Sequence, residues 1–167
     1  AGGVCLNEGC IPSKALIHVA KQFHFVTNKA KDLGIHVSKV TYNHKEAVAH
    51  KNKVVRKLTT GIKGLLKANK VTFIKGTAKI EAPGVIQVDG ERVGYKNLVL
   101  ATGSDIIELP FLPSDHKKIL SSRTALDLEK VPKALVVIGG GYIGLELGMT
   151  FANLGTKVTV VEALKDF

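Results

Sequence analysis

Apolar side chains recur at helical spacing along two stretches in the first half of the chain. The first stretch opens at Pro12-Ser13, because proline is tolerated in the first turn of a helix, and it ends at Leu33-Gly34. Its apolar positions are Ala15, Leu16, Val19, Ala20, Phe23 and Val26. The second stretch runs from about Asn43 to Ala68. Its buried positions are expected to be Val48, Val54, Val55, Leu58, Ile62, Leu65 and Leu66, with lysines and arginines opposite. Both stretches predict amphipathic helices.

Shorter runs of apolar and β-branched residues predict strands after each helix. The predicted strands are Ile35–Val40, Val71–Ile74, Thr77–Ile80, Val85–Val88 and Tyr95–Ala101. Asp89-Gly90 follows the fourth of these runs and predicts a hairpin turn. The last run has Asn-Leu-Val-Leu-Ala in its centre and is predicted to be a buried strand.

The pattern of apolar and polar residues changes near Lys133. Before it, a proline-rich stretch from Pro110 to Pro113 breaks the pattern, and a short helix is expected around residues 122–128. After it come an apolar strand over 134–138, a helix over 142–153 and a second strand over 156–161. This order predicts a βαβ unit that begins a new domain. The linker between the two domains is placed at roughly residues 104–132.

Length and composition narrow the class of protein. The chain has 167 residues, enough for one ordinary domain. It starts at Ala1 and ends at Phe167, just after a predicted strand, so we expect it to be a piece of a larger protein. Its formal net charge is +10, but the lysines are scattered and tryptophan is absent, which favours a solvated surface over nucleic-acid binding. No apolar run reaches the ~18 residues of a membrane span.

A glycine-rich turn opens the second domain. Residues 139–144, Gly-Gly-Gly-Tyr-Ile-Gly, fit the GxGxxG pattern, follow an apolar strand and open a helix. Gly139 permits the tight turn, Gly141 lets the backbone approach a pyrophosphate, and Gly144 lets helix and strand pack closely. Glu162 lies roughly twenty residues on, where an acidic side chain accepts hydrogen bonds from the adenine ribose. No arginine follows it before the end of the chain, so the pattern favours NAD over NADP.

The only two cysteines, Cys5 and Cys10, are separated by four residues. A disulfide between them would close a very short loop, and short loops gain little stability from a crosslink. A redox purpose explains the pair better, because neighbouring thiols are oxidised reversibly and a helix N-terminus favours the thiolate.

Three segments of the chain together resemble the flavin disulfide reductases, which are pyridine nucleotide-disulfide oxidoreductases. They are GGVCLNEGCIPSK at 2–14, LVLATGS at 98–104 and VIGGGYIGLE at 137–146. Within that family they are most similar to the dihydrolipoamide dehydrogenases. The resemblance implies an α/β fold of Rossmann-like, three-layer FAD- and NAD(P)-binding domains. A partial FAD-binding domain would cover residues 1–112, and residues 113–167 would begin an NAD-binding domain.

The resemblance also implies roles for single residues. Cys5 would be the thiol that exchanges with substrate, and Cys10 the thiol beside the flavin. Lys14 would lie near the flavin N5 edge, with Glu146 as its acidic partner. The implied FAD-binding positions are Gly3, Val4, Lys14, Ala78, Thr102, Gly103 and Ser104. The implied NAD-binding positions are Gly139, Gly140, Gly141, Tyr142, Ile143, Gly144 and Glu162. Tyr142 fits a surface tyrosine nearly as well as a cover for the nicotinamide pocket.

One residue departs from the family pattern. Glu8 stands between the two cysteines, where a small apolar residue is expected. Its negative charge would disfavour a thiolate.

The implied activity is the oxidation of dihydrolipoamide to lipoamide through a Cys5–Cys10 disulfide and FAD, with NAD⁺ as hydride acceptor. The dihydrolipoamide would belong to a 2-oxoacid dehydrogenase or glycine cleavage complex. The family's catalytic base and its homodimer surface lie in a C-terminal region, so we expect this piece to be inactive alone. The expected location is bacterial cytoplasm, with the mitochondrial matrix as the other possibility.

Three other readings remain open at this point. Mercuric and glutathione reductases use the same thiol relay but prefer NADP. A zinc site would need two ligands beyond the cysteine pair. The chain would otherwise be a non-catalytic nucleotide-binding fragment. His18, one turn after Lys14, is interpreted as an ordinary helix residue rather than a base.

Overall fold

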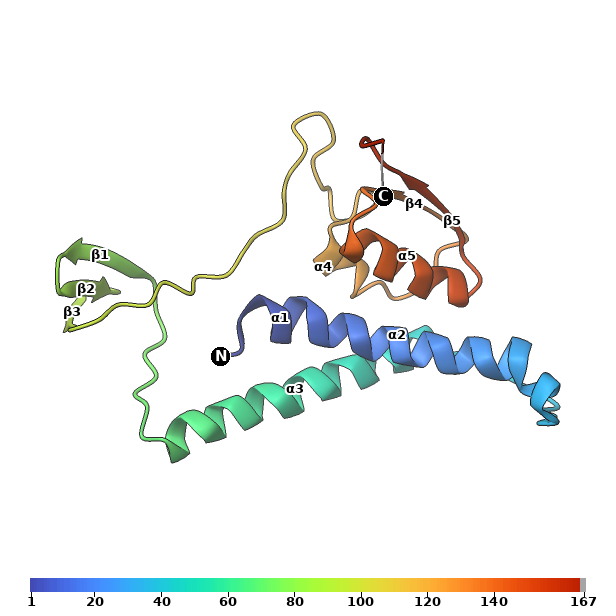
Figure 1. Cartoon of the computed structure of the whole chain (residues 1–167), viewed down its shortest axis with the longest axis horizontal. Helices are drawn as coiled ribbons and strands as arrows, with labels where there is room; N and C mark the ends of the chain where they lie inside the picture. Colours follow the sequence, from blue (N-terminus) through green and yellow to red (C-terminus); the bar gives the residue numbers. More distant parts are fainter. Residues whose placement is uncertain (166–167) are drawn as a thin grey trace.

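The computed structural model describes residues 1–165 and consists of three parts (Figure 1). Two long helices lie side by side, a small antiparallel sheet stands apart at one end, and a βαβ unit rests on the helices. No helix within residues 1–165 has both the length and the apolar character that a bilayer crossing requires. The mixture of α and β structure agrees with the predicted α/β fold class.

The first helical region begins earlier than predicted. A short helix, α1 (Gly3–Glu8), ends at Gly9, and α2 (Cys10–His24) starts at once. The carbonyl of Gly9 accepts the amide of Ser13 at 3.1 Å and closes the first turn. Pro12 fits inside that turn because its missing N–H would have no intrahelical partner there. Cys5 therefore lies in α1, and Cys10 is the first residue of α2.

The end of that region was predicted correctly. After α2 the chain continues as a π-helix, η1 (Phe25–Lys29), and a 3₁₀ turn, η2 (Ala30–Leu33). Gly34 then stops it with φ of 77°, a left-handed conformation that favours glycine.

Helix α3 (His44–Ala68) confirms the second predicted helix. The Asn43 side chain caps it by accepting the Glu46 amide at 3.4 Å. The predicted buried stripe is wrong at Leu58 and Leu65, which are exposed, Leu65 to 60%. Its other positions are half-buried: Val48, Val54, Val55, Ile62 and Leu66. The fully buried residues of α3, His44, Ala47 and Lys51, all lie in its first turns, and the later turns of the helix are covered only in part. Figure 1 shows the C-terminal end of α3 extending past α1.

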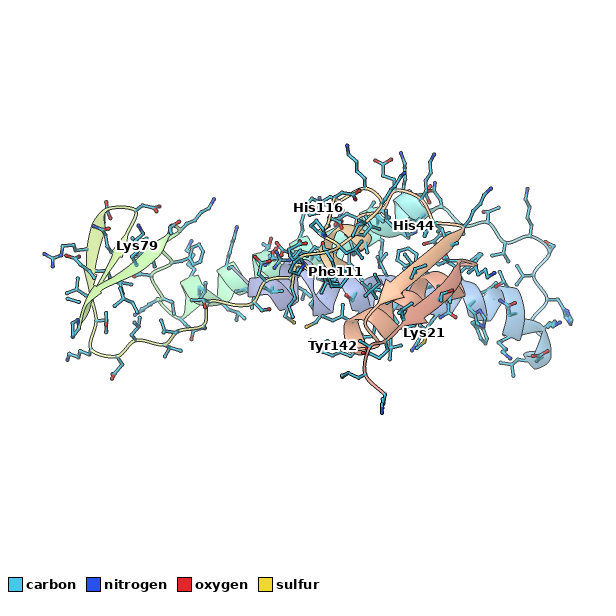
Figure 2. All side chains as sticks on the ribbon, turned by 90° about the horizontal axis from the view of Figure 1, so that it is seen from above. Lys21, His44, Lys79, Phe111, His116 and Tyr142 are labelled. Carbon is cyan, nitrogen blue, oxygen red and sulfur yellow. The ribbon has the colours of Figure 1, made fainter. Side chains whose placement is uncertain are left out.

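The small sheet is an antiparallel meander of β1 (Ala78–Ala82), β2 (Val85–Val88) and β3 (Glu91–Gly94). Asp89 and Gly90 connect the last two strands with φ of 46° and 98°, which confirms the predicted hairpin. Lys79 of β1 marks the isolated position of this sheet in a second view (Figure 2).

Three predicted strands do not form. Residues 35–40, 71–74 and 95–101 have no ladder partner among residues 1–165. Val99 is 85% exposed, so the predicted buried strand over 95–101 is wrong here. A strand exists only when another strand accepts its backbone hydrogen bonds, whatever its side chains favour.

The βαβ unit matches its prediction closely. Strands β4 (Ala134–Ile138) and β5 (Lys157–Val161) pair in parallel, and α5 (Tyr142–Asn153) connects them. The short helix before it, α4 (Ser122–Ala125), is three residues shorter at its end than predicted. Burial alternates along both strands, because α5 covers one face of the pair and the other face is exposed.

The core joins the βαβ unit to the long helices. Leu16 of α2, Ala47 of α3, Leu126 and Leu147 of α5 form one buried cluster. Phe151 of α5 is also fully buried. The chain nevertheless exposes 12530 Å², well above the roughly 8,000 Å² expected for a compact monomer of 17.9 kDa. The packing is therefore concentrated where α2, α3 and α5 meet.

A buried lysine strengthens this junction. The Lys51 side chain is 4% exposed, and its Nζ donates to the Leu126 carbonyl at 3.0 Å and pairs with Asp127, which is 68% exposed. Close by, the Tyr42 hydroxyl lies 2.8 Å from Nδ1 of His44. Burial raises the pKa of Tyr42 to about 12. Burial, and then the charge of Lys51, lower the pKa of His44, so this histidine is neutral beside the lysine.

We expect Asp127→Ala to destabilise the protein more than Lys51→Met. The first change leaves a buried ammonium with one carbonyl partner and costs about 2–3 kcal/mol. The second leaves a carboxylate that water already solvates and costs about 1 kcal/mol. Urea unfolding of the full-length protein measures both. Glu129→Ala, which breaks the exposed Lys45–Glu129 pair, is the control and changes stability by less than about 0.5 kcal/mol. The reverse order of the two effects would contradict this account.

Candidate redox and nucleotide site

Cys5 and Cys10 are exposed thiols on either side of the α1–α2 junction. Gly9 makes this junction tight: a Cβ there would lie 3.2 Å from the Val4 carbonyl oxygen and 3.3 Å from the Cys5 Cα. A side-chain hydrogen bond with Cys10 is the main cause that raises the pKa of Cys5. Cys5 therefore holds its proton to higher pH than an isolated thiol.

The lysine and the glutamate that the family motifs single out are brought together. Lys14 of α2 and Glu146 of α5 form a salt bridge, although 132 positions separate them. Their side chains are 57% and 36% exposed, so the pair is accessible rather than buried. It borders a groove of about 220 Å³ between the two helices. The groove is also lined by Ile17, Lys21, Met149, Thr150 and Asn153.

The segment 102–104 approaches the redox helix. Gly103 has φ of 84°, and a Cβ there would meet the Val4 side chain at 3.3 Å. Gly3 also has a left-handed backbone, with φ of 61°. Two of the predicted FAD-binding segments, around residues 3–4 and 102–104, thus lie in contact. This close approach suits glycine, which has no Cβ, and the bare backbone that it leaves fits a cofactor bound alongside.

Ala78 does not join this group. It begins β1 in the separate sheet, far from α1 in both views (Figures 1 and 2). The Asp89 side chain instead accepts the Thr77 amide at 2.9 Å and ties the start of β1 to the hairpin.

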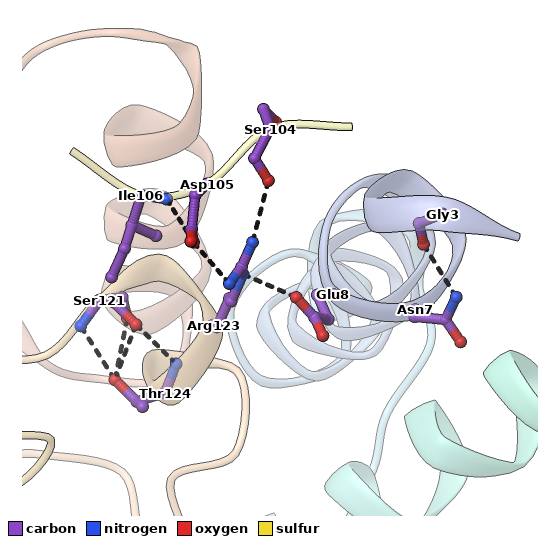
Figure 3. A network of polar contacts seen from close by, with 9 residues as sticks. All are labelled: Gly3, Asn7, Glu8, Ser104, Asp105, Ile106, Ser121, Arg123 and Thr124. Carbon is purple, nitrogen blue, oxygen red and sulfur yellow. Dashed lines mark hydrogen bonds and ion pairs between the residues drawn. The ribbon is translucent and has the colours of Figure 1, made fainter. Parts of the chain in front are cut away.

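Arg123, which no sequence pattern singles out, connects the two segments that do meet (Figure 3). It pairs with Glu8 at 2.7 Å and with Asp105 at 2.8 Å. It also donates to the Ser104 carbonyl at 3.1 Å. Its helix α4 starts with a capping box, in which Ser121 and Thr124 exchange hydrogen bonds. The unusual glutamate at position 8 was the one available signal, because a partly covered carboxylate calls for a cation.

The glycine-rich turn has the geometry that its pattern predicts. Gly139 has φ of 100°, where a side chain would be strained. A Cβ at Gly144 would lie 2.9 Å from Val137 Cγ1 and closer still to the Gly139 carbonyl oxygen. Helix α5 begins after Gly141 with no side-chain cap from residues 1–165. Its first amides therefore offer an anion site that fits a pyrophosphate.

Glu162 closes over this turn. Its carboxylate accepts the Gly140 amide at 2.5 Å and the Leu164 amide at 2.8 Å. Hydrogen bonds from the Leu164 and Gly140 amides hold the pKa of Glu162 below its usual range. An ionised carboxylate at this place favours a ribose hydroxyl over a phosphate.

The remaining candidates are less informative. Tyr142 and Ile143 are exposed at the start of α5. His18 is exposed on α2. Among the residues that the structure describes, no group of three or more His, Cys, Asp or Glu side chains is arranged to hold a metal ion.

A family model described as pyridine nucleotide-disulphide oxidoreductase matches residues 1–167. The chain belongs to this family. Dihydrolipoyl dehydrogenases of the family use FAD and NAD.

Named relatives agree with this assignment. The chain is 48% identical over 166 residues to mitochondrial dihydrolipoyl dehydrogenase of Pisum sativum, covering 96% of this chain and 33% of the relative. It is 45% identical over 169 residues to dihydrolipoyl dehydrogenase of Staphylococcus aureus, covering 99% and 36%. It is also 46% identical to leghemoglobin reductase of Vigna unguiculata, covering 99% and 32%. The chain thus spans about a third of these relatives.

Solved structures show the same fold. LpdA from Mycobacterium tuberculosis superimposes with a TM-score of 0.86 at 26% identity, covering 99% of this chain and 37% of that one. The Cu(II) complex of the HOCl-induced flavoprotein disulfide reductase RclA from Escherichia coli gives 0.79 at 30% identity, covering 99% and 34%.

We expect Gly144→Ala to weaken NAD binding by about tenfold or more, because the added methyl group pushes α5 away from the turn. Isothermal titration of the full-length protein with NAD⁺ measures the change. Gly148→Ala, one turn along the same helix, is the matched control. Its Cβ would lie 3.4 Å from Val137 and Val158, an ordinary contact. Equal losses of affinity in both variants would contradict the packing argument.

We also expect Glu162→Gln to lower the preference for NAD over NADP by about tenfold, because a charge-assisted hydrogen bond and a repulsive charge are both lost. The ratio of the two Kd values measures it. Since the folded pKa of Glu162 is lowered, its charge is present above the unfolded value of about 4.3 and is lost only below it. The wild-type preference should therefore be constant from about pH 6 to about pH 8, and a preference that collapses in this range would contradict the assignment.

Proposed function

We propose that the full-length protein containing this chain is a dihydrolipoyl dehydrogenase, which oxidises dihydrolipoamide to lipoamide with NAD⁺ as the final acceptor. The observation that carries the proposal is the thiol pair at the α1–α2 junction, with Lys14 one turn further on and joined to Glu146 of the βαβ unit. The thiol pair near the start of α2 and the glycine-rich turn at the start of α5 support this proposal, because α2 and α5 pack against each other.

The thiol chemistry follows from the pair itself. In the oxidised protein, one sulfur of dihydrolipoamide attacks Cys5 of the Cys5–Cys10 disulfide, forms a mixed disulfide and releases Cys10 as a thiolate. The second substrate sulfur then attacks the first, which closes the lipoamide ring and releases Cys5. Two electrons reach the protein as a dithiol, and the substrate's two thiol protons pass to Cys5 and to solvent or a base. FAD, when bound, supplies the path from this dithiol to NAD⁺.

Other residues of this chain bind the two cofactors. Gly3, Val4 and the 102–104 segment provide backbone for FAD, and Lys14 with Glu146 provides a charged pair near its ring. Ala78, at the start of β1, contacts the adenine side of FAD. The glycine-rich turn, Tyr142, Ile143 and Glu162 hold NAD. The lowered pKa of Glu162 supports its role as an anion beside the ribose.

The domain arrangement and the partners belong to the same proposal. Residues 1–112 form part of an FAD-binding domain, and residues 113–167 begin an NAD-binding domain. The partner is a lipoyl-bearing 2-oxoacid dehydrogenase or glycine cleavage complex, and the enzyme is a homodimer. Relatives occur in bacteria and in mitochondria, and we propose the bacterial cytoplasm. Because the chain spans a third of its relatives, we expect it to be inactive alone.

The proposal is tested by anaerobic titration of the full-length flavoprotein with dihydrolipoamide, followed by visible absorption. We expect a long-wavelength thiolate-to-flavin band that disappears when NAD⁺ is added. In Cys5→Ser the remaining Cys10 thiolate should give this band without substrate, and in Cys10→Ser the band should be absent. Both variants should lose lipoamide turnover by about 10³-fold or more, because the exchange needs two sulfurs.

Two results would redirect the proposal. A bound flavin that ignores dihydrolipoamide but responds to NADPH would identify a reductase of the mercuric or glutathione type. Absence of flavin from the purified protein would leave a non-catalytic nucleotide-binding protein with a thiol pair.

A further inference from the structure

Among residues 1–165, the guanidinium of Arg123 is the one polar group that links the thiol segment to the 102–105 segment. Its Nε pairs with Glu8 Oε2 at 2.7 Å, and its Nη1 pairs with Asp105 Oδ1 at 2.8 Å. Its Nη2 donates to the Ser104 carbonyl at 3.1 Å. All three nitrogens are used, as Figure 3 shows, and the planar fork fixes the angle between the groups that it joins.

The segment that Arg123 holds has little else to fix it. Residues 95–108 form no strand and pair with no strand in the described structure. The contact of Gly103 with Val4 sets how closely this segment approaches α1. An apolar contact of this kind does not fix the register of the segment, whereas a hydrogen bond to the Ser104 carbonyl does. The position of residues 102–104 relative to Cys5 thus depends on Arg123.

The second effect of Arg123 is on charge. Glu8 ends α1, three residues after Cys5 and two before Cys10. An uncompensated carboxylate at that place disfavours both thiolates. Asp105 is mostly exposed, so water screens its charge, whereas the charge of Arg123 acts on the less exposed Glu8. The Arg123 side chain is about one-third exposed, so solvent screens the pair only in part.

We propose that Arg123 is a positioning residue of the redox site, which holds Glu8 and the 102–105 segment in register and cancels the charge of Glu8 beside the two thiols. This rests on the proposed function only in assuming that the thiols and residues 102–104 serve one site.

The test uses the reduced full-length protein and iodoacetamide, with the alkylation rate of each cysteine followed by peptide mass spectrometry at neutral pH. This rate needs neither flavin nor substrate. Arg123→Met should slow alkylation about two- to fivefold, and Glu8→Gln should accelerate it about twofold. Together the two substitutions should return the rate to near wild type. Arg123→Lys, which keeps the charge without the fork, should stay within about twofold of wild type.

Arg92→Met is the matched control, because Arg92 forms an exposed pair with Glu81 at 3.0 Å in the separate sheet. It should leave alkylation unchanged. The proposal is overturned if Arg123→Met alkylates like the control, or if adding Glu8→Gln fails to restore the rate. If Arg123→Met does not fold, Glu8→Gln decides alone: an unchanged rate overturns the proposal.

A second readout separates positioning from charge. In the flavin-loaded protein, Arg123→Lys should keep the alkylation rate but reduce the long-wavelength thiolate band per bound flavin by about half or more, because the register of residues 102–105 relaxes. An unchanged band overturns the positioning part. If the variants show the expected alkylation rates but the wild-type protein does not react with dihydrolipoamide, the proposed function is rejected. The role of Arg123 at the thiols is then retained.

Discussion

The packing of α2 against α5 is the constraint on which the rest of the structure depends. Leu16 and Leu147 meet in the buried cluster, and Phe151 of α5 is buried with its ring facing His44 of α3. Because the two helices are held at this junction, Lys14 and Glu146 come within reach of each other. The same contact places the thiol segment at the start of α2 near the glycine-rich turn at the start of α5. An apolar junction therefore determines where the charged groups lie.

Two buried or half-buried cations then hold neighbouring segments in place around the apolar junction. The buried Lys51 of α3 donates to the Leu126 carbonyl and pairs with Asp127. These contacts connect α3 to the segment that leads into the βαβ unit. Arg123 fastens the thiol helix to the 102–105 segment. In both cases a cation satisfies a backbone carbonyl and a carboxylate at once. This is how a segment without secondary structure acquires a fixed place.

The half of the molecule away from this junction is open. The C-terminal half of α3, the 95–101 segment and the β1–β3 sheet expose apolar side chains, and no described segment covers them. The chain spans about a third of its relatives. The Lys14–Glu146 pair nevertheless connects the two helices of the packed junction, whereas Ala78 lies in the separate sheet.

The sequence by itself determined the elements whose cause is local. Asn43 at the N-cap, Gly34 at a helix end, Asp89-Gly90 at the hairpin and the glycine turn at 139–144 each act through neighbouring backbone, so their elements were predicted almost to the residue. The family motifs likewise predicted the Lys14–Glu146 pair. Tertiary structure alone decided whether an apolar run becomes a strand, because the ladder partner is remote in sequence, and residues 95–101 therefore failed their prediction. It alone revealed Arg123, since no periodicity records a contact between residues 8, 104 and 123. Local rules act through the adjacent backbone, whereas the site is assembled from side chains that only the packing of α2, α4 and α5 brings together.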